Sequence, residues 1–174
     1  MAHQELNAID GWLHLNTWKE GLLSKMGHDL LLNIEEFSLS IDGEVEGPWQ
    51  AQLTVRKDSF QVVEPTTLSA KDRTDIHKNI CKELPSDIQF VGEIKKDSET
   101  KLLANGKISI GRHQSPIRFY FDLDEKKVSG RGELTHSALK LKPFKAPFGL
   151  IRIKDQIELS FSFALAEWFN TQES

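Results

Sequence analysis

The sequence predicts an all-β protein, built as one antiparallel sheet that curls or closes around a single apolar interior. The longest alternating stretch, residues 155–168, places large apolar side chains on one side and small or polar ones on the other. This two-residue period is typical of a strand with one buried face. Similar stretches recur between turn residues along most of the chain, and only residues 69–84 have the period of a helix.

Composition narrows the class of protein. The chain has 174 residues, of which 39% are hydrophobic, and a net charge of −4, so we expect one domain over residues 1–174 with a core of about 11–168. The charges are mixed in sign, which argues against nucleic acid and against an anionic membrane surface as partners. Cys81 is the only cysteine, so no internal disulfide can form.

Targeting signals are not visible in the sequence. The first ten residues lack both a positively charged and an apolar segment, and no stretch approaches the roughly 18 apolar residues of a membrane helix. We therefore expect a cytoplasmic protein with no integral membrane segment.

The first half of the chain predicts a series of strands. Residues 12–18 alternate, and residues 28–34 and 37–41 follow as one long bent strand or two short ones. Another strand opens near Leu53, but its apolar parity changes before Phe60, which indicates a bulge near residues 58–59.

The one convincing helix spans about residues 69–84. Ile76, Ile80 and Leu84 repeat every four residues and form a narrow apolar stripe. Ser69 is placed to cap the start, and a proline follows the last turn. A stripe this narrow fits the outside of the sheet or an opening at its end.

The second half predicts a meander of hairpins over residues 88–94, 102–110, 117–123 and 128–134, before the long strand at the end. Glycines occupy the inner parity of these strands, where they relieve crowding or leave room beside the backbone. Alternation lapses over residues 137–149, which predicts an apolar loop, either a lid or a plug at one end of the sheet.

Chemistry-bearing motifs are few. No nucleotide fingerprint, nucleophile elbow or zinc-type cysteine spacing occurs, so we expect no catalytic residue, no metal and no resident cofactor. By parity His28 and His136 face one end of the interior. They could bind a metal, form an acid–base pair, contact a ligand's polar head or simply bond to the backbone. His77 reads as a solvated helix residue.

The inward phenylalanines have two interpretations, a plain core or the wall of a lipid tunnel. A closed barrel of eight strands is about the smallest whose interior can hold one small ligand. The predicted ligand-binding residues are Leu30, Leu32, Phe90, Ile108, Phe119, Phe121, Leu134, Leu159, Phe161, Phe163, His28 and His136.

Several runs together resemble the YceI-like family of lipid-binding proteins. The similar segments are residues 68–77 with 84–90, residues 102–111 with Pro116-Ile117, Phe148-Gly149-Leu150 with residues 155–159, and Gly27-His28-Asp29-Leu30. The resemblance covers roughly residues 11–166 and implies an eight-stranded lipocalin-like antiparallel barrel that binds an isoprenoid or similar amphiphile without catalysis. Many relatives are exported to the periplasm. Lys145-Ala146-Pro147 stands where the family usually has Arg and Asp, so the resemblance implies nothing about charges at the mouth.

The leading hypothesis is therefore a non-enzymatic carrier or sequestering protein for a polyisoprenoid, quinone or fatty-acid derivative. One alternative is a filled barrel that acts as a protein-interaction module. The other is a small hydrolase-type enzyme that uses His28 and His136. The expected partner is an apolar small molecule, with a bound lipid in place of a cofactor, and a homodimer stays open.

Overall fold

The structure, a computed structural model, describes residues 1–21, 29–143 and 152–165. The described strands form one sheet in the order β1-β4-β5-β7-β8-β9-β10-β11-β2-β3-β6, with antiparallel neighbours. The elements are β1 (Ala2–Leu6), β2 (Gly11–Glu20), β3 (Leu30–Ile34), β4 (Phe37–Gly43), β5 (Trp49–Val55), β6 (Phe60–Glu64), α1 (Ala70–Glu83), β7 (Ile88–Lys96), β8 (Lys101–Ile110), β9 (His113–Asp124), β10 (Lys127–Thr135) and β11 (Arg152–Ala164).

The prediction of eight strands is wrong, because the described residues contain eleven. Of the two forms left open for residues 28–41, the structure has two short strands separated at residues 35–36. The bulge expected near residues 58–59 is instead a turn at residues 56–59 that divides the next strand into two. The Ser59 hydroxyl and amide both donate to the Arg56 carbonyl and hold a tight turn there. The third extra strand, β1, shows little apolar alternation, since only Leu6 is buried in it, and pairing with β4 holds it in place.

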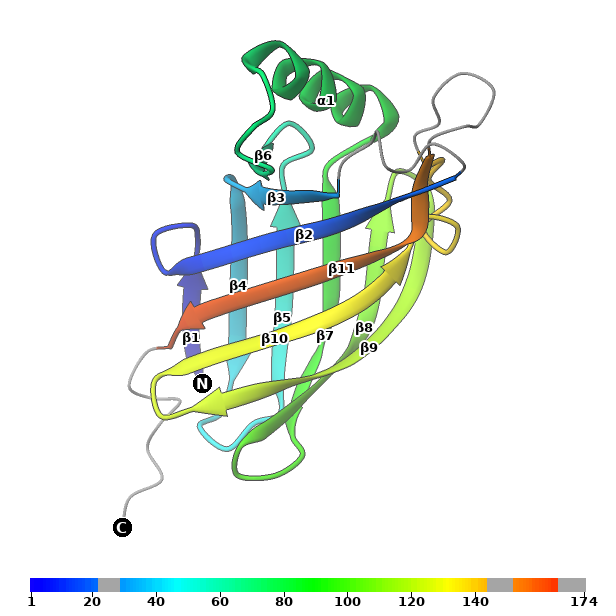
Figure 1. The fold of residues 1–174 in the computed structure, drawn as a ribbon. Helices are drawn as coiled ribbons and strands as arrows, with labels where there is room; N and C mark the ends of the chain where they lie inside the picture. The colour runs from blue at the N-terminus through cyan, green and yellow to red at the C-terminus, as the bar shows by residue number, and fades with distance from the viewer. Residues whose placement is uncertain (22–28, 144–151, 166–174) are drawn as a thin grey trace.

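The same bends make the sheet curl. The chain passes directly from β3 to β4 and from β5 to β6. In the strand order β4 and β5 lie near one edge of the sheet, whereas β3 and β6 lie at the other. In Figure 1, β10, β11 and β2 pass diagonally in front of β4, β5 and β7. No pairing between the edge strands β1 and β6 closes the described sheet, so it is a curled half-barrel.

The helix α1 lies above one end of the curled sheet (Figure 1). It begins where expected, because the Ser69 side chain accepts a hydrogen bond from the Asp72 amide. The Arg73 guanidinium donates to the carbonyls of Val62, Pro65 and Leu68 at 2.6 to 3.3 Å. The bond to Val62 attaches α1 to the edge strand β6, which would otherwise carry an unpaired carbonyl there. The other two bonds attach α1 to the loop between β6 and the helix.

His77 completes this attachment, and its prediction as a solvated residue is wrong. The ring is half-buried, and its Nδ1 lies 2.9 Å from the Phe60 carbonyl, to which it donates. No described helix is long and apolar enough to cross a membrane.

Strand boundaries differ from prediction mainly at the end of the chain. The closing strand was predicted over residues 155–168, whereas β11 spans Arg152–Ala164. Leu165 lies beyond the strand but stays buried, and its amide donates to the Lys126 carbonyl at 2.8 Å. Residues 166–168, and residues 144–149 of the loop predicted over 137–149, lie outside the described residues.

Candidate functional site

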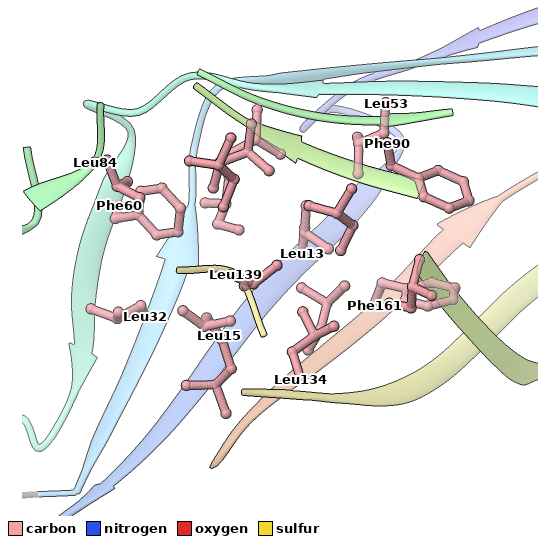
Figure 2. A pocket seen from close by; sticks show the side chains of 18 of the residues that line it. Leu13, Leu15, Leu32, Leu53, Phe60, Leu84, Phe90, Leu134, Leu139 and Phe161 are labelled. Carbon is pink, nitrogen blue, oxygen red and sulfur yellow. The ribbon is translucent and has the colours of Figure 1, made fainter. Parts of the chain in front are cut away.

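A cavity of about 530 Å³ lies inside the curled sheet and beneath α1. Figure 2 shows aliphatic and aromatic side chains from several strands, among them Leu13, Leu53 and Phe161, pointing toward this common space. The volume falls within the roughly 300–1,000 Å³ of small-molecule sites. The apolar walls follow from the alternation in each strand, because one face of every strand points inward.

The structure brings eleven of the twelve predicted ligand-binding residues to this cavity. His28 lies outside the described residues. The others all line the cavity, namely Leu30, Leu32, Phe90, Ile108, Phe119, Phe121, Leu134, His136, Leu159, Phe161 and Phe163. Parity placed the ten that lie in strands, since each stands on the inward face of its strand, and His136 follows directly after β10. Their contact with a ligand stays a prediction.

The polar part of the lining was mostly missed by the sequence interpretation. It consists of six residues, Thr17, Asp75, Asn79, Glu83, His136 and Lys142, among a lining that is otherwise apolar. Asp75, Asn79 and Glu83 follow one another at four-residue steps on α1. They stand immediately before Ile76, Ile80 and Leu84, so a helical projection of the apolar stripe could have identified them.

A tight turn after β10 carries His136 to the cavity. The His136 amide and ring Nδ1 both lie within 3.0 Å of the Asp155 carbonyl. A carbonyl only accepts, so Nδ1 carries the proton, and Nε2 of the neutral ring is an acceptor. The prediction of a backbone-bonded histidine at the end of the sheet is therefore confirmed for His136.

The Asp155 carboxylate fixes the same turn. It accepts hydrogen bonds from the Ser137 hydroxyl at 2.5 Å and the Ser137 amide at 2.8 Å. These bonds to Ser137, with a smaller contribution from the nearby His136 ring, hold the pKa of Asp155 below its ordinary value of 3.8. Because the turn is tied to β11, the buried Leu139 that follows is held against the cavity.

Thr17 is the polar residue buried most deeply in the lining. Its side chain is on the inward face of β2, opposite Leu30 on β3 and Ile157 on β11. The residue is only 7% exposed, and its hydroxyl has no hydrogen-bond partner among the described residues. Buried hydroxyls are nearly always paired, so an unpaired one facing a cavity is notable.

The opposite part of the interior is filled by phenylalanine rings. Phe161 lies 5.6 to 6.0 Å from the ring centroids of Phe119, Phe121 and Phe163. Phe37 reaches the group from β4, at 5.6 Å from Phe163. The prediction left open whether these residues are core or tunnel wall. In the structure they are both core and wall, because Phe119, Phe121, Phe161 and Phe163 pack on one another and also line the cavity.

Glycines give these rings their room. A Cβ at Gly130 would lie 2.5 Å from the Phe121 Cβ, and one at Gly106 would lie 2.8 Å from the Phe90 ring. At Gly132, by contrast, an added Cβ would only touch Phe119 at an ordinary 3.7 Å. Three of the four inward glycines, including Gly92, therefore admit neighbouring atoms closely, and Gly132 alone leaves room.

Beyond this region β9 and β10 separate. They pair only where Lys127–Gly130 faces Phe121–Asp124, and a second, shallower pocket lies between residues 115–118 and 133–135. His113 bridges the gap through a 2.8 Å contact between its Nε2 and the Ala138 carbonyl. The interior is thus walled continuously at the phenylalanines and less completely near His136.

The described residues contain no group of three His, Cys, Asp or Glu residues that could hold a metal. The Cys81 thiol lies 3.6 Å from Nε2 of His77, one turn earlier on α1. The His77 Nδ1 is already bonded to the Phe60 carbonyl, and neither residue lines the cavity.

Comparison with known proteins supports the fold alone. No protein-family model matches the chain, and no curated protein matches it in sequence. Among solved structures, the crystal structure of Burkholderia cenocepacia BcnA is similar, with a TM-score of 0.65 and 12% sequence identity over 90% of this chain and 96% of that one. The chain therefore shares the fold of BcnA.

Proposed function

We propose that this protein binds a long-chain apolar molecule, a polyisoprenoid, quinone or fatty-acid derivative, and carries or sequesters it without catalysis. The observation that carries the proposal is the cavity of about 530 Å³ with walls made almost entirely of hydrocarbon. The motif resemblance to YceI-like lipid-binding proteins supports the same ligand class. The structural likeness to BcnA supports the fold that encloses it.

Burial supplies the binding energy. A chain ligand that removes about 400 Å² of apolar surface from water gains on the order of 10 kcal/mol at about 25 cal/mol per Å². Ordering and immobilisation oppose this gain, which leaves affinities from about micromolar to nanomolar. Dispersion contacts with Phe90, Phe121 and Phe161 add to the gain, because the walls already lie in place.

The most direct test is to identify what the purified protein carries. Organic extraction followed by mass spectrometry should yield an apolar molecule in a stoichiometric amount. Refilling of the delipidated protein with isoprenoids of increasing length should then stop when the tail outgrows the cavity. A protein that yields no lipid and takes up none would instead favour the interaction module.

A charge placed in the wall tests the location. Phe121→Arg should abolish lipid retention, because the guanidinium would lie in hydrocarbon. Tyr120→Arg is the matched control, since Tyr120 is the next residue on β9, points outward and is 49% exposed. Retention by a folded Phe121→Arg protein would contradict an interior site.

A second variant covers the case in which Phe121→Arg fails to fold. Gly132→Leu adds a side chain where the structure leaves room for a Cβ, so the protein should fold with a smaller cavity. Lipid capacity should fall for long tails first, whereas Gly132→Ala should leave it close to the wild-type level.

The enzyme hypothesis has a different test. Turnover of a bound ester that is lost on His136→Ala, with uptake intact, would favour that hypothesis instead.

A further inference from the structure

Thr17 combines burial, position and an unmet hydrogen bond in one side chain. Thr17 lines the cavity, and its hydroxyl is buried and has no partner among the described residues. A hydroxyl left unpaired in an apolar interior is unfavourable. Rotation about the Cα–Cβ bond exchanges the hydroxyl with the methyl group and presents it to the cavity, where a ligand oxygen or nitrogen that pairs with it removes that cost.

The charged residues of the lining favour one kind of head group. Lys142 is the one cation among the described residues that line the cavity, and it is exposed to water. Asp75 and Glu83, on α1, also line the cavity and are also exposed. A carboxylate or phosphate beside the buried Thr17 would lose its hydration while the one lining cation stays in water, and it would share the cavity with two carboxylates, which is unfavourable.

An uncharged oxygen meets neither objection. The Thr17 hydroxyl can donate to a carbonyl or accept from an alcohol, since it carries one proton and two lone pairs. His136 lies on the same side of the cavity, because Leu134, two residues before it, stands in the row Thr17–Ile157–Leu134 across three strands. Its Nε2 can accept from a second hydroxyl.

Resting on the proposed function, we infer that the preferred ligand carries an uncharged hydroxyl or carbonyl head beside Thr17, and that Thr17 is the residue that selects it. The hydrocarbon tail then extends along β2 and β11 toward Phe161. The Phe161 row stands four residues from Thr17 along β2, a distance of about 13 Å.

Four compounds with one tail and different heads test this inference. Farnesol, farnesoic acid, farnesyl diphosphate and the hydrocarbon farnesene should compete with a neutral fluorescent probe, N-phenyl-1-naphthylamine, for the delipidated protein at pH 7.5. Farnesol should bind at least about tenfold more tightly than either anion, and about fivefold more tightly than farnesene, as one net hydrogen bond allows.

The variant Thr17→Val then assigns the effect to the hydroxyl. It should weaken farnesol about fivefold and leave farnesene unchanged. The matched control Thr54→Val should change neither, because Thr54 lies on the outward parity of β5, between Ser38 and Gln89, and does not line the cavity.

The possible outcomes distinguish a failure of this inference from a failure of the proposed function. If the probe and all four compounds fail to bind, the proposed function fails. If farnesene binds but farnesol gains nothing over it, or an anion binds as tightly as farnesol, the inference is overturned while the function stands. The comparison of heads uses the wild-type protein, so it holds even if Thr17→Val does not fold.

Discussion

Two rows of residues across the same strands differ in how completely they fill the interior. One row runs Leu13, Phe161, Gly130, Phe121 and Leu102 across five paired strands. The other runs Thr17, Ile157 and Leu134 and stops, because β9 does not pair with β10 there. The first row is packed with rings, whereas the second faces the open part of the cavity. The same strands therefore make a level packed with rings and a more open level of one cavity.

The comparison of the two rows shows that ring size and glycine placement together set how closely the interior packs. Phe121 and Phe161 meet over Gly130, which leaves their side of β10 free of any side chain. The neighbours of Thr17 in its own row, Leu30, Ile157 and Leu134, are all aliphatic. We expect mutations in the two rows to differ in both size and sign.

The largest effect should come from truncating the packed row. Phe161→Ala removes a ring that contacts three others and should lower the free energy of unfolding by about 3–5 kcal/mol. Leu134→Ala, in the open row, should cost about 2 kcal/mol because its side chain already borders empty space. Urea denaturation of the delipidated protein measures both, and equal losses would show that the rows are equally packed.

The two β10 glycines should respond in opposite directions. Gly130→Ala places a Cβ against Phe121 and should destabilise the protein by about 1–3 kcal/mol through overpacking. Gly132→Ala meets only an ordinary contact, so the stiffer unfolded chain should give a gain of about 0.5 kcal/mol. The same sign at both positions would contradict the difference in packing along β10.

Thr17→Val should stabilise the empty protein. The substitution removes the unpaired hydroxyl and keeps the branched shape, so the free energy of unfolding should rise by about 1 kcal/mol. Thermal denaturation before and after lipid loading checks it, since a ligand that pairs with Thr17 should reduce this gain. Destabilisation of the empty protein would mean that the hydroxyl has a partner outside the described residues.

The smallest effect concerns the turn that carries His136. The lowered pKa of Asp155 means that its bonds to Ser137 stabilise the fold while the carboxylate is ionised. This contribution is fully present above the ordinary aspartate pKa of 3.8 and is lost as pH falls through the lower folded-state pKa. The melting temperature of Asp155→Asn should therefore lie below that of wild type at pH 6, and the gap should shrink toward pH 2.5.

A gap that stays constant over this range would remove the carboxylate as its cause. His136→Gln serves as the control, because it leaves the Ser137 bonds to Asp155 in place. That variant should keep most of the wild-type dependence on pH below 4, because the His136 ring contributes less than the Ser137 bonds to the lowered pKa of Asp155.

The sequence predicted the elements with a clear period and missed those without one. The helix cap at Ser69 and the inward parity of Phe119, Phe121 and Leu159 were all readable, because each depends on neighbours a few residues away. The strand β1 was missed since its order comes from pairing with β4, more than thirty residues later. The role of His77 was also hidden, because its partner at Phe60 lies on another element.

The local pattern of residues is enough to give nearly every strand an inward apolar face, since a side-chain period of two needs only local backbone geometry. How far those faces fill the space between them is a property of the folded sheet. That depends on where residues 35–36 and 56–59 bend, where β9 leaves β10 and which rings meet across the interior. The volume of the cavity arises only when the sheet is assembled. The same holds for the lack of a hydrogen-bond partner for the Thr17 hydroxyl among the described residues.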